Sequence, residues 1–138
     1  MDSFGHLMEW GRVLEEIDRL RISGELDEHQ RGLLRVLRYR GNWRLREAVL
    51  RAVTEMDAPG ETLLSAVLEI MVDGSLYHEV RVLAAEALAS GLARAHEQKR
   101  HDLDDLKQRA VEHANELLNS TQAPVVCEGV RLVLSSVE

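Results

Sequence analysis

One short stretch, residues 80–88 with the sequence VRVLAAEAL, constrains the fold of this chain more than any other. Its apolar residues recur with the i, i+3, i+4 spacing of a helix that buries one broad face. Several of these residues are alanine, and Gly91 falls on the same face. Because side chains this small let neighbouring backbones approach closely, we expect this helix to lie among other helices.

Two further stretches repeat the pattern, residues 45–53 closely and residues 126–134 less closely. The equivalent positions are Leu45, Val80 and Val126, which are 35 and 46 residues apart. Repeats of about this length, each with two helices, are typical of α-solenoids. We therefore predict an all-α fold: a short right-handed α-solenoid of three helical hairpins, residues 26–57, 59–98 and 102–138, behind a capping helix within residues 1–24.

The composition supports a single all-α domain. The chain has 138 residues, of which 45% are hydrophobic and 4% aromatic, and it contains two prolines. A chain of this length buries enough surface for one hydrophobic core. Its many Leu, Ala, Glu and Arg residues favour helix over strand, and no segment has the alternating pattern of a β-hairpin.

Capping residues and turn signals set the expected helix boundaries. We expect helices over residues 3–22, 27–40, 43–56, 59–72, 76–98, 102–118 and 124–137. Asp27 is the expected N-cap of the second helix, with Gln30 as its capping-box partner. Asn42 and Ser75 are the expected N-caps of the third and fifth helices.

The second helix of each predicted hairpin resembles that of HEAT repeats. In that family an apolar residue is followed by Arg and then by Ala and Leu at fixed offsets. The matching residues here are Leu45, Arg46, Ala48 and Ala52 in one copy, and Val80, Arg81, Ala84, Ala87 and Leu88 in the next. The third copy has Cys127 in place of the Arg. The resemblance covers about residues 26–138 and implies a rigid scaffold that binds other proteins.

An enzymatic branch of HEAT-like proteins provides an alternative. Deoxyhypusine hydroxylases hold two irons with His-Glu pairs at helix starts, and His78-Glu79 occupies such a place here. The other copies have Trp43-Arg44 and Val125-Val126 instead. A di-iron centre needs several such pairs, so we interpret this one as ordinary first-turn residues, where a helix dipole favours Glu.

A second group of polar residues lies around a predicted helix break. Its members are His96, Glu97, His101, Asp102, Asp104 and Asp105. We interpret the group as a solvated linker with an acidic helix start, not as a metal site. The chain also lacks a glycine-rich phosphate loop and a His-Glu-x-x-His motif. We therefore predict a non-enzymatic protein without catalytic residues, metal or cofactor.

Charge is unevenly distributed along the chain. The net charge is −7, which argues against a general nucleic-acid or anionic-membrane binder, yet residues 31–51 contain seven Arg and one acidic residue. This cluster is the strongest candidate for a binding site. The candidate residues are Arg31, Arg35, Arg38, Tyr39, Arg40, Trp43 and Arg44.

The Arg cluster admits three interpretations. Guanidinium groups beside aromatic rings bind carboxylates, phosphates or stacked bases. The cluster therefore predicts a site for another protein with an acidic surface or, alternatively, for nucleic acid. The third interpretation is a solvated face that is partly paired within the chain, since Asp27 lies four residues before Arg31 and Glu47 four before Arg51.

Together these patterns predict a non-catalytic protein–protein interaction or scaffold module. Its binding face would comprise the second helix of each hairpin and the Arg cluster, and self-association stays open. Cys127 is the single cysteine and we expect it to pack as a small apolar residue. No signal-peptide pattern and no apolar run of about 18 residues is present, so we expect a cytoplasmic protein.

Overall fold

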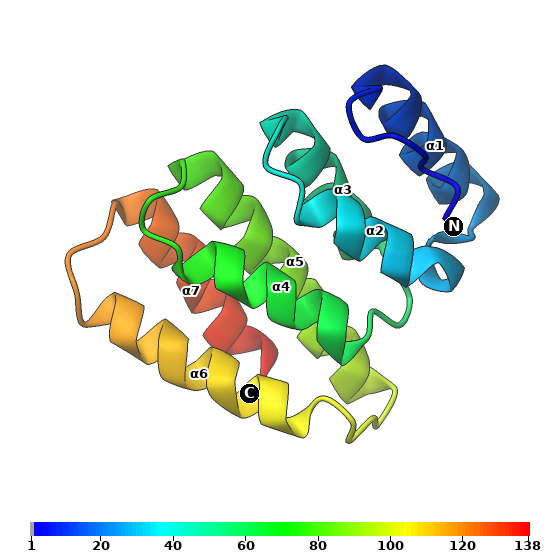
Figure 1. The fold of residues 1–138 in the computed structure, drawn as a ribbon. Coiled ribbons are helices and arrows are strands. Elements are labelled where there is room, and N and C mark those ends of the chain that lie inside the picture. The colour runs from blue at the N-terminus through cyan, green and yellow to red at the C-terminus, as the bar shows by residue number, and fades with distance from the viewer. Residues whose placement is uncertain (1) are drawn as a thin grey trace.

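The computed structural model describes residues 2–138, which form helices joined by short connections (Figure 1). The helices are α1 (Trp10–Ser23), α2 (Gln30–Leu37), α3 (Trp43–Glu55), α4 (Glu61–Val72), α5 (His78–Glu97), α6 (Asp104–Leu118) and α7 (Pro124–Ser136), with a 3-10 turn, η1 (Leu26–His29), before α2. Residues 2–138 contain no β-strand, so the predicted all-α class is confirmed. None of the helices in this part of the chain has the length and hydropathy needed to cross a membrane.

The helices pack in two layers (Figure 1). In one layer α1 contacts α3, α3 contacts α5, and α5 contacts α7. In the other layer α2 contacts α4, and α4 contacts α6. Each helix of the second layer also packs on the helix that follows it in the chain: α2 on α3, α4 on α5 and α6 on α7. Helix α5 therefore lies among other helices, as its small residues predict.

Small side chains explain how α5 reaches so many neighbours. Ala85 and Ala87 are 1% exposed or less. A Cβ atom added to Gly129 of α7 would lie 3.1 Å from the Cβ atom of Ala85, so these two helices are in close contact. Gly91 of α5 lies equally close to Leu64 of α4, where an added Cβ atom would be 2.9 Å from a methyl carbon.

The first predicted helix begins later than expected. Residues 2–9 contain no helix, and α1 starts at Trp10. Phe4 is 4% exposed because its ring packs on α2 at Gly32, where an added Cβ atom would lie 2.6 Å from a ring carbon. Trp10, the first residue of α1, is 46% exposed. The buried aromatic of this region thus comes from the segment before the helix.

The predicted capping roles of Asp27 and Gln30 are wrong. No side chain caps the start of η1 or of α2. The Asp27 carboxylate instead accepts hydrogen bonds from the backbone N–H groups of Asp57 (3.0 Å) and Ala58 (2.7 Å), and Oε1 of Gln30 accepts one from Gly60 (2.7 Å). These two side chains hold the connection between α3 and α4, which is a long-range role that no local pattern reveals.

The other predicted caps have mixed outcomes. Oδ1 of Asn42 accepts a hydrogen bond from the backbone N–H of Arg44 (2.9 Å), so Asn42 caps α3 as predicted. The hydroxyl of Ser75 donates to Asp73 (2.6 Å), and α5 begins only at His78, so Ser75 is not its cap. Helix α2 ends at residue 37, three residues before the predicted end.

Candidate functional site

The two arginines of the repeated pattern bind the protein's own backbone. Arg81 is 3% exposed, and it donates from Nε to the carbonyl oxygen of Met71 (2.9 Å) and from Nη1 to Oε1 of Gln122 (3.1 Å). Half-buried Arg46 donates from Nε to the carbonyl oxygen of Leu37 (3.0 Å). Each carbonyl lies at the end of the preceding helix, where acceptors lack intrahelical partners. Burial lowers the pKa of both arginines, and their role is structural.

The third copy of the pattern has no arginine to donate to the carbonyl oxygen at the end of the preceding helix. Cys127 takes the arginine's place, and its thiol is half-buried and free. Leu117 precedes Cys127 by the same ten residues that separate Met71 from Arg81. Its carbonyl oxygen accepts a hydrogen bond from the hydroxyl of Ser120 (2.9 Å). The backbone N–H of Ser120 donates to the same oxygen (3.2 Å), so this carbonyl has local donors and needs no arginine.

Arg35, one of the predicted binding residues, is engaged within the chain. Its Nε and Nη2 atoms donate to the two carboxylate oxygens of Asp2 (2.8 and 2.6 Å), and Nη2 also donates to the carbonyl oxygen of Gly5 (2.8 Å). The hydrogen bonds from Arg35 hold the pKa of Asp2 below its usual value. This pair fastens the segment that carries Phe4 onto α2, so Arg35 is not a free binding group.

The remaining predicted arginines form no ion pair within residues 2–138. They are Arg31, Arg38, Arg40 and Arg44. Arg38 and Arg40 border a pocket of about 310 Å³ between the ends of α2 and α4, which Glu69 and Asp73 also line. The guanidinium of Arg40 helps to lower the pKa of Asp73, although hydrogen bonds from Ser75 contribute more.

Two exposed aromatic side chains lie at the starts of α3 and α5. Trp43, the first residue of α3, is 53% exposed, and Tyr77, directly before α5, is 74% exposed. Both line a pocket of about 300 Å³ between the starts of α3 and α5, together with Glu47, Glu79 and Val80. The guanidinium carbon of Arg44 lies 5.6 Å from the centroid of the Trp43 ring, within the range of a cation–π interaction.

We call the surface formed by Arg38, Arg40, Trp43, Arg44 and Tyr77 the Arg–aromatic edge. These residues lie in or beside the α2–α3 and α4–α5 connections, which are at the same end of the helices (Figure 1).

Three predicted residues fall outside the Arg–aromatic edge. Arg31 lies near the start of α2, where it lines a pocket with Asp27 and Glu28. Tyr39 is half-buried and packs against Gly41. The third is Arg35, which Asp2 binds.

Tyr77 is not among the predicted residues, because it lies far from the Arg cluster in the chain. One signal was available. Tyr77 precedes Val80 by three residues, as Asn42 precedes Leu45. The repeat therefore places Tyr77 at the start of the second helix of its hairpin, as it places Trp43 in the hairpin before.

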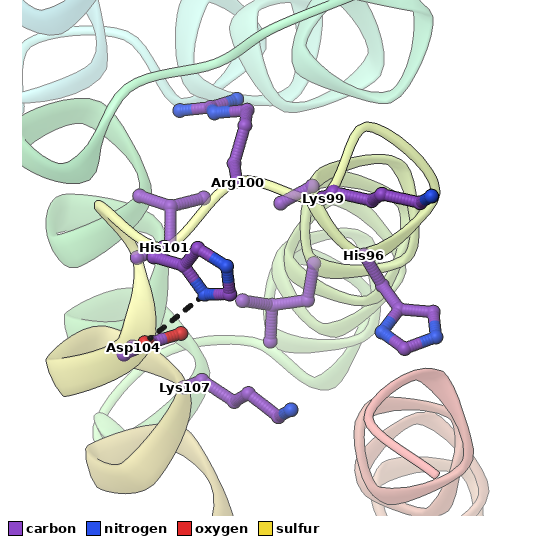
Figure 2. A pocket seen from close by; sticks show the side chains of 9 residues that line it. His96, Lys99, Arg100, His101, Asp104 and Lys107 are labelled. Carbon is purple, nitrogen blue, oxygen red and sulfur yellow. Dashed lines mark ion pairs between the residues drawn. The ribbon is translucent and has the colours of Figure 1, made fainter.

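A second cationic group lies at the other end of α5 (Figure 2). His96 and His101, both from the predicted polar linker, line a pocket of about 320 Å³ together with Lys99, Lys107 and Asp104. Among the described residues, no three His, Cys, Asp or Glu side chains come together as ligands for a metal ion. The pocket is therefore lined by two lysines and one carboxylate beside the two histidines.

Comparisons of the chain with protein-family models, with curated proteins and with solved structures found no match.

Proposed function

We propose that this protein is a short HEAT-like α-solenoid that acts as a non-catalytic protein-binding module. Its partner is a protein with an acidic surface, which binds at the Arg–aromatic edge. On this proposal residues 26–57, 59–98 and 102–138 are the three hairpins, and residues 1–24 contain the helix that caps the stack.

The packing of the helices supports the solenoid part of the proposal. Helices α3, α5 and α7 follow one another in one layer, and α2, α4 and α6 follow one another in the other. Arg46 and Arg81 each reach back to the end of the preceding helix with the same Nε hydrogen bond. The same hydrogen bond in two successive hairpins is expected if the hairpins are copies of one structural unit. Helix α1 packs on α3, as a helix that covers the first hairpin would.

The observation that carries the binding proposal is the combination of side chains at the Arg–aromatic edge. Trp43 and Tyr77 are half or more exposed, although aromatic residues of this size normally bury most of their surface. Arg38 and Arg40 lie nearby with no ion-pair partner in residues 2–138. Arg, Trp and Tyr are the residue types that contribute most to protein–protein binding energy.

Rigidity is the mechanism by which such a surface gains affinity. The aromatic residues stand at the starts of α3 and α5, and the buried faces of both helices are packed in the core. The Arg44 guanidinium is already positioned over the Trp43 ring. Because packing fixes the backbone of both helices before binding, the entropy lost on association is reduced.

Charge favours an acidic protein over nucleic acid as the partner. The net charge of the chain is −7, and the acidic residues Glu47, Glu69, Asp73 and Glu79 border the two pockets of the Arg–aromatic edge. A nucleic acid that extends across this surface would place its phosphates close to these carboxylates, which repel them. A short acidic segment that contacts only the guanidinium groups avoids them.

Affinity capture from extracts of the native host tests the proposal. The wild-type protein, the double variant Arg38→Glu/Arg40→Glu and the matched control Arg12→Glu/Arg131→Glu are immobilised, and each extract is divided and treated with nuclease or left untreated. Arg12 and Arg131 are exposed and lie on α1 and α7, away from the edge. Circular dichroism verifies that all three proteins are folded.

The proposal predicts a protein that the wild type and the control retain after nuclease treatment and that the edge variant loses. Equal retention by the edge variant would show that another surface binds it. Loss of all retained material on nuclease treatment would assign the surface to nucleic acid, and the steep salt dependence of phosphate contacts would accompany that result.

A further inference from the structure

The two lysines of this chain, Lys99 and Lys107, line the same pocket. Apart from histidine, every other basic residue in the sequence is arginine. The pocket lies where α5 ends and α6 begins, and its volume is about 320 Å³, at the lower end of the range for small-molecule sites.

Four basic side chains surround this pocket over an apolar base. Figure 2 shows His101 and Lys107 on one side, with Lys99 and His96 on the other. The apolar lining comes from Leu92, Ala95 and Leu103, which are 4%, 4% and 3% exposed.

The positive charge in the pocket is only partly neutralised. Asp104 is the acidic residue of the lining, and its Oδ2 atom lies 3.6 Å from Nδ1 of His101. Arg100 points away from the pocket (Figure 2), because its guanidinium donates to Asp102 (2.8 Å) and to the carbonyl oxygen of Pro59 (3.3 Å). Within residues 2–138, neither lysine has an ion pair or a side-chain hydrogen bond.

The backbone at Lys99 is a second unusual feature of the pocket. Its φ angle is 56°, which makes it the non-glycine residue with a positive φ in residues 2–138. It follows the end of α5, at a position where helices usually place glycine because a side chain is strained there. A lysine at this position therefore lowers the stability of the fold. Residues with such backbone strain are concentrated at functional sites.

We propose that this pocket binds a phosphate monoester that carries a small apolar substituent. The ammonium groups of Lys99 and Lys107 match the charge of nearly −2 on a phosphate monoester at neutral pH. The imidazoles of His96 and His101 donate further hydrogen bonds to the phosphate, and the substituent packs on Leu92 and Leu103. This site is separate from the Arg–aromatic edge, which lies at the start of α5.

The test is an NMR titration of the isotopically labelled protein at constant ionic strength. The probes are phenyl phosphate, inorganic phosphate, benzoate and sodium chloride. The variants are Lys99→Gln/Lys107→Gln and the matched control Arg12→Gln/Arg131→Gln, which removes the same charge elsewhere. Saturable shifts of residues 92–107 with phenyl phosphate are expected, with at least about tenfold weaker binding to the lysine variant and unchanged binding to the control.

The variant Lys99→Gly separates a binding role from a structural one. Glycine relieves the positive φ angle, so a higher melting temperature and weaker phenyl phosphate binding are expected together. If Lys99 serves only to offset the negative end of the α5 dipole, this variant leaves binding unchanged.

Several results would overturn the proposal. One is the absence of saturable shifts in residues 92–107, and another is equal affinity of the lysine variant and the wild type. Benzoate binding as tight as that of phenyl phosphate would reject the phosphate assignment. Equal shifts with chloride would show general ion binding only.

Discussion

The Nε atom of Arg81 donates a 2.9 Å hydrogen bond to the carbonyl oxygen of Met71, which joins the start of α5 to the end of α4. Arg46 and Leu37 repeat this relationship between α3 and α2. Where the arginine is missing, the hydroxyl of Ser120 donates to the Leu117 carbonyl oxygen, which satisfies this acceptor without joining α7 to α6. The arginine of the repeated sequence pattern therefore serves as a hydrogen-bond donor to the free carbonyl groups at the end of the preceding helix.

Replacement of Arg81 tests this explanation. Arg81→Ala leaves the Met71 carbonyl without its donor and opens a cavity, so we expect the free energy of unfolding to fall by about 3 kcal/mol. Arg81→Met keeps most of the apolar volume and is expected to lose about half of that. Half-buried Arg46 serves as the comparison, and Arg46→Ala is expected to cost about 1 kcal/mol. Urea denaturation measures all three, and equal losses at both positions would contradict the account.

Close approach of α7 to α5 at Gly129 is a second testable feature. A larger side chain at Gly129 must displace Ala85, whose Cβ atom would lie 3.1 Å from the new Cβ atom, so Gly129→Leu is expected to destabilise the protein by about 2 kcal/mol. Gly11 in α1 is the matched control, because no atom lies within 4 Å of an added Cβ there. Gly11→Ala is expected to raise stability by about 0.5 kcal/mol. A neutral effect of Gly129→Leu in thermal unfolding would show that the helices are not in close contact.

Helix content and the small-residue helix were predictable from the sequence because both depend on local spacing. Residues 80–88 show the 3.6-residue period directly, and α5 lies among neighbours as expected. Phe4 and Gly32 carry no comparable signal. Their contact depends on the path of the N-terminal segment across α2, which is a long-range property.

The candidate site was predictable only in part for the same reason. The Arg cluster is visible as a run of charge, but a sequence does not show which guanidinium groups find partners. Arg35 is bound by Asp2, 33 residues away, and Arg46 by a backbone carbonyl. Tyr77 joins Trp43 only because α3 and α5 lie side by side.

The Asp2–Arg35 pair predicts a pH-dependent attachment of the N-terminal segment. The pKa of Asp2 is lowered in the folded protein, so the folded carboxyl binds a proton less readily than the unfolded one. The pair therefore contributes its full stability above the ordinary Asp value of 3.8, and the contribution is lost as the pH falls through the lowered pKa.

The variant Asp2→Asn measures this contribution. The side chain of Arg35 is 41% exposed, so we expect a loss of only about 0.5–1 kcal/mol in unfolding free energy at about pH 7. The difference between variant and wild type is expected to shrink as the solution is acidified below pH 3.8. Asp18→Asn, which removes an exposed pair with Arg21, is the control for a general charge effect. A difference that persists unchanged in acid would contradict the attachment by this pair.

The most direct test of the Arg–aromatic edge is an NMR titration of the labelled protein with a polyglutamate peptide at low salt. The account predicts the largest shifts in residues 38–44 and at residues 77–80, loss of these shifts in Arg38→Glu/Arg40→Glu, and weaker binding as salt is added. Shifts confined to other parts of the surface, including the neighbourhood of Lys99 and Lys107, or no shifts at all, would contradict it.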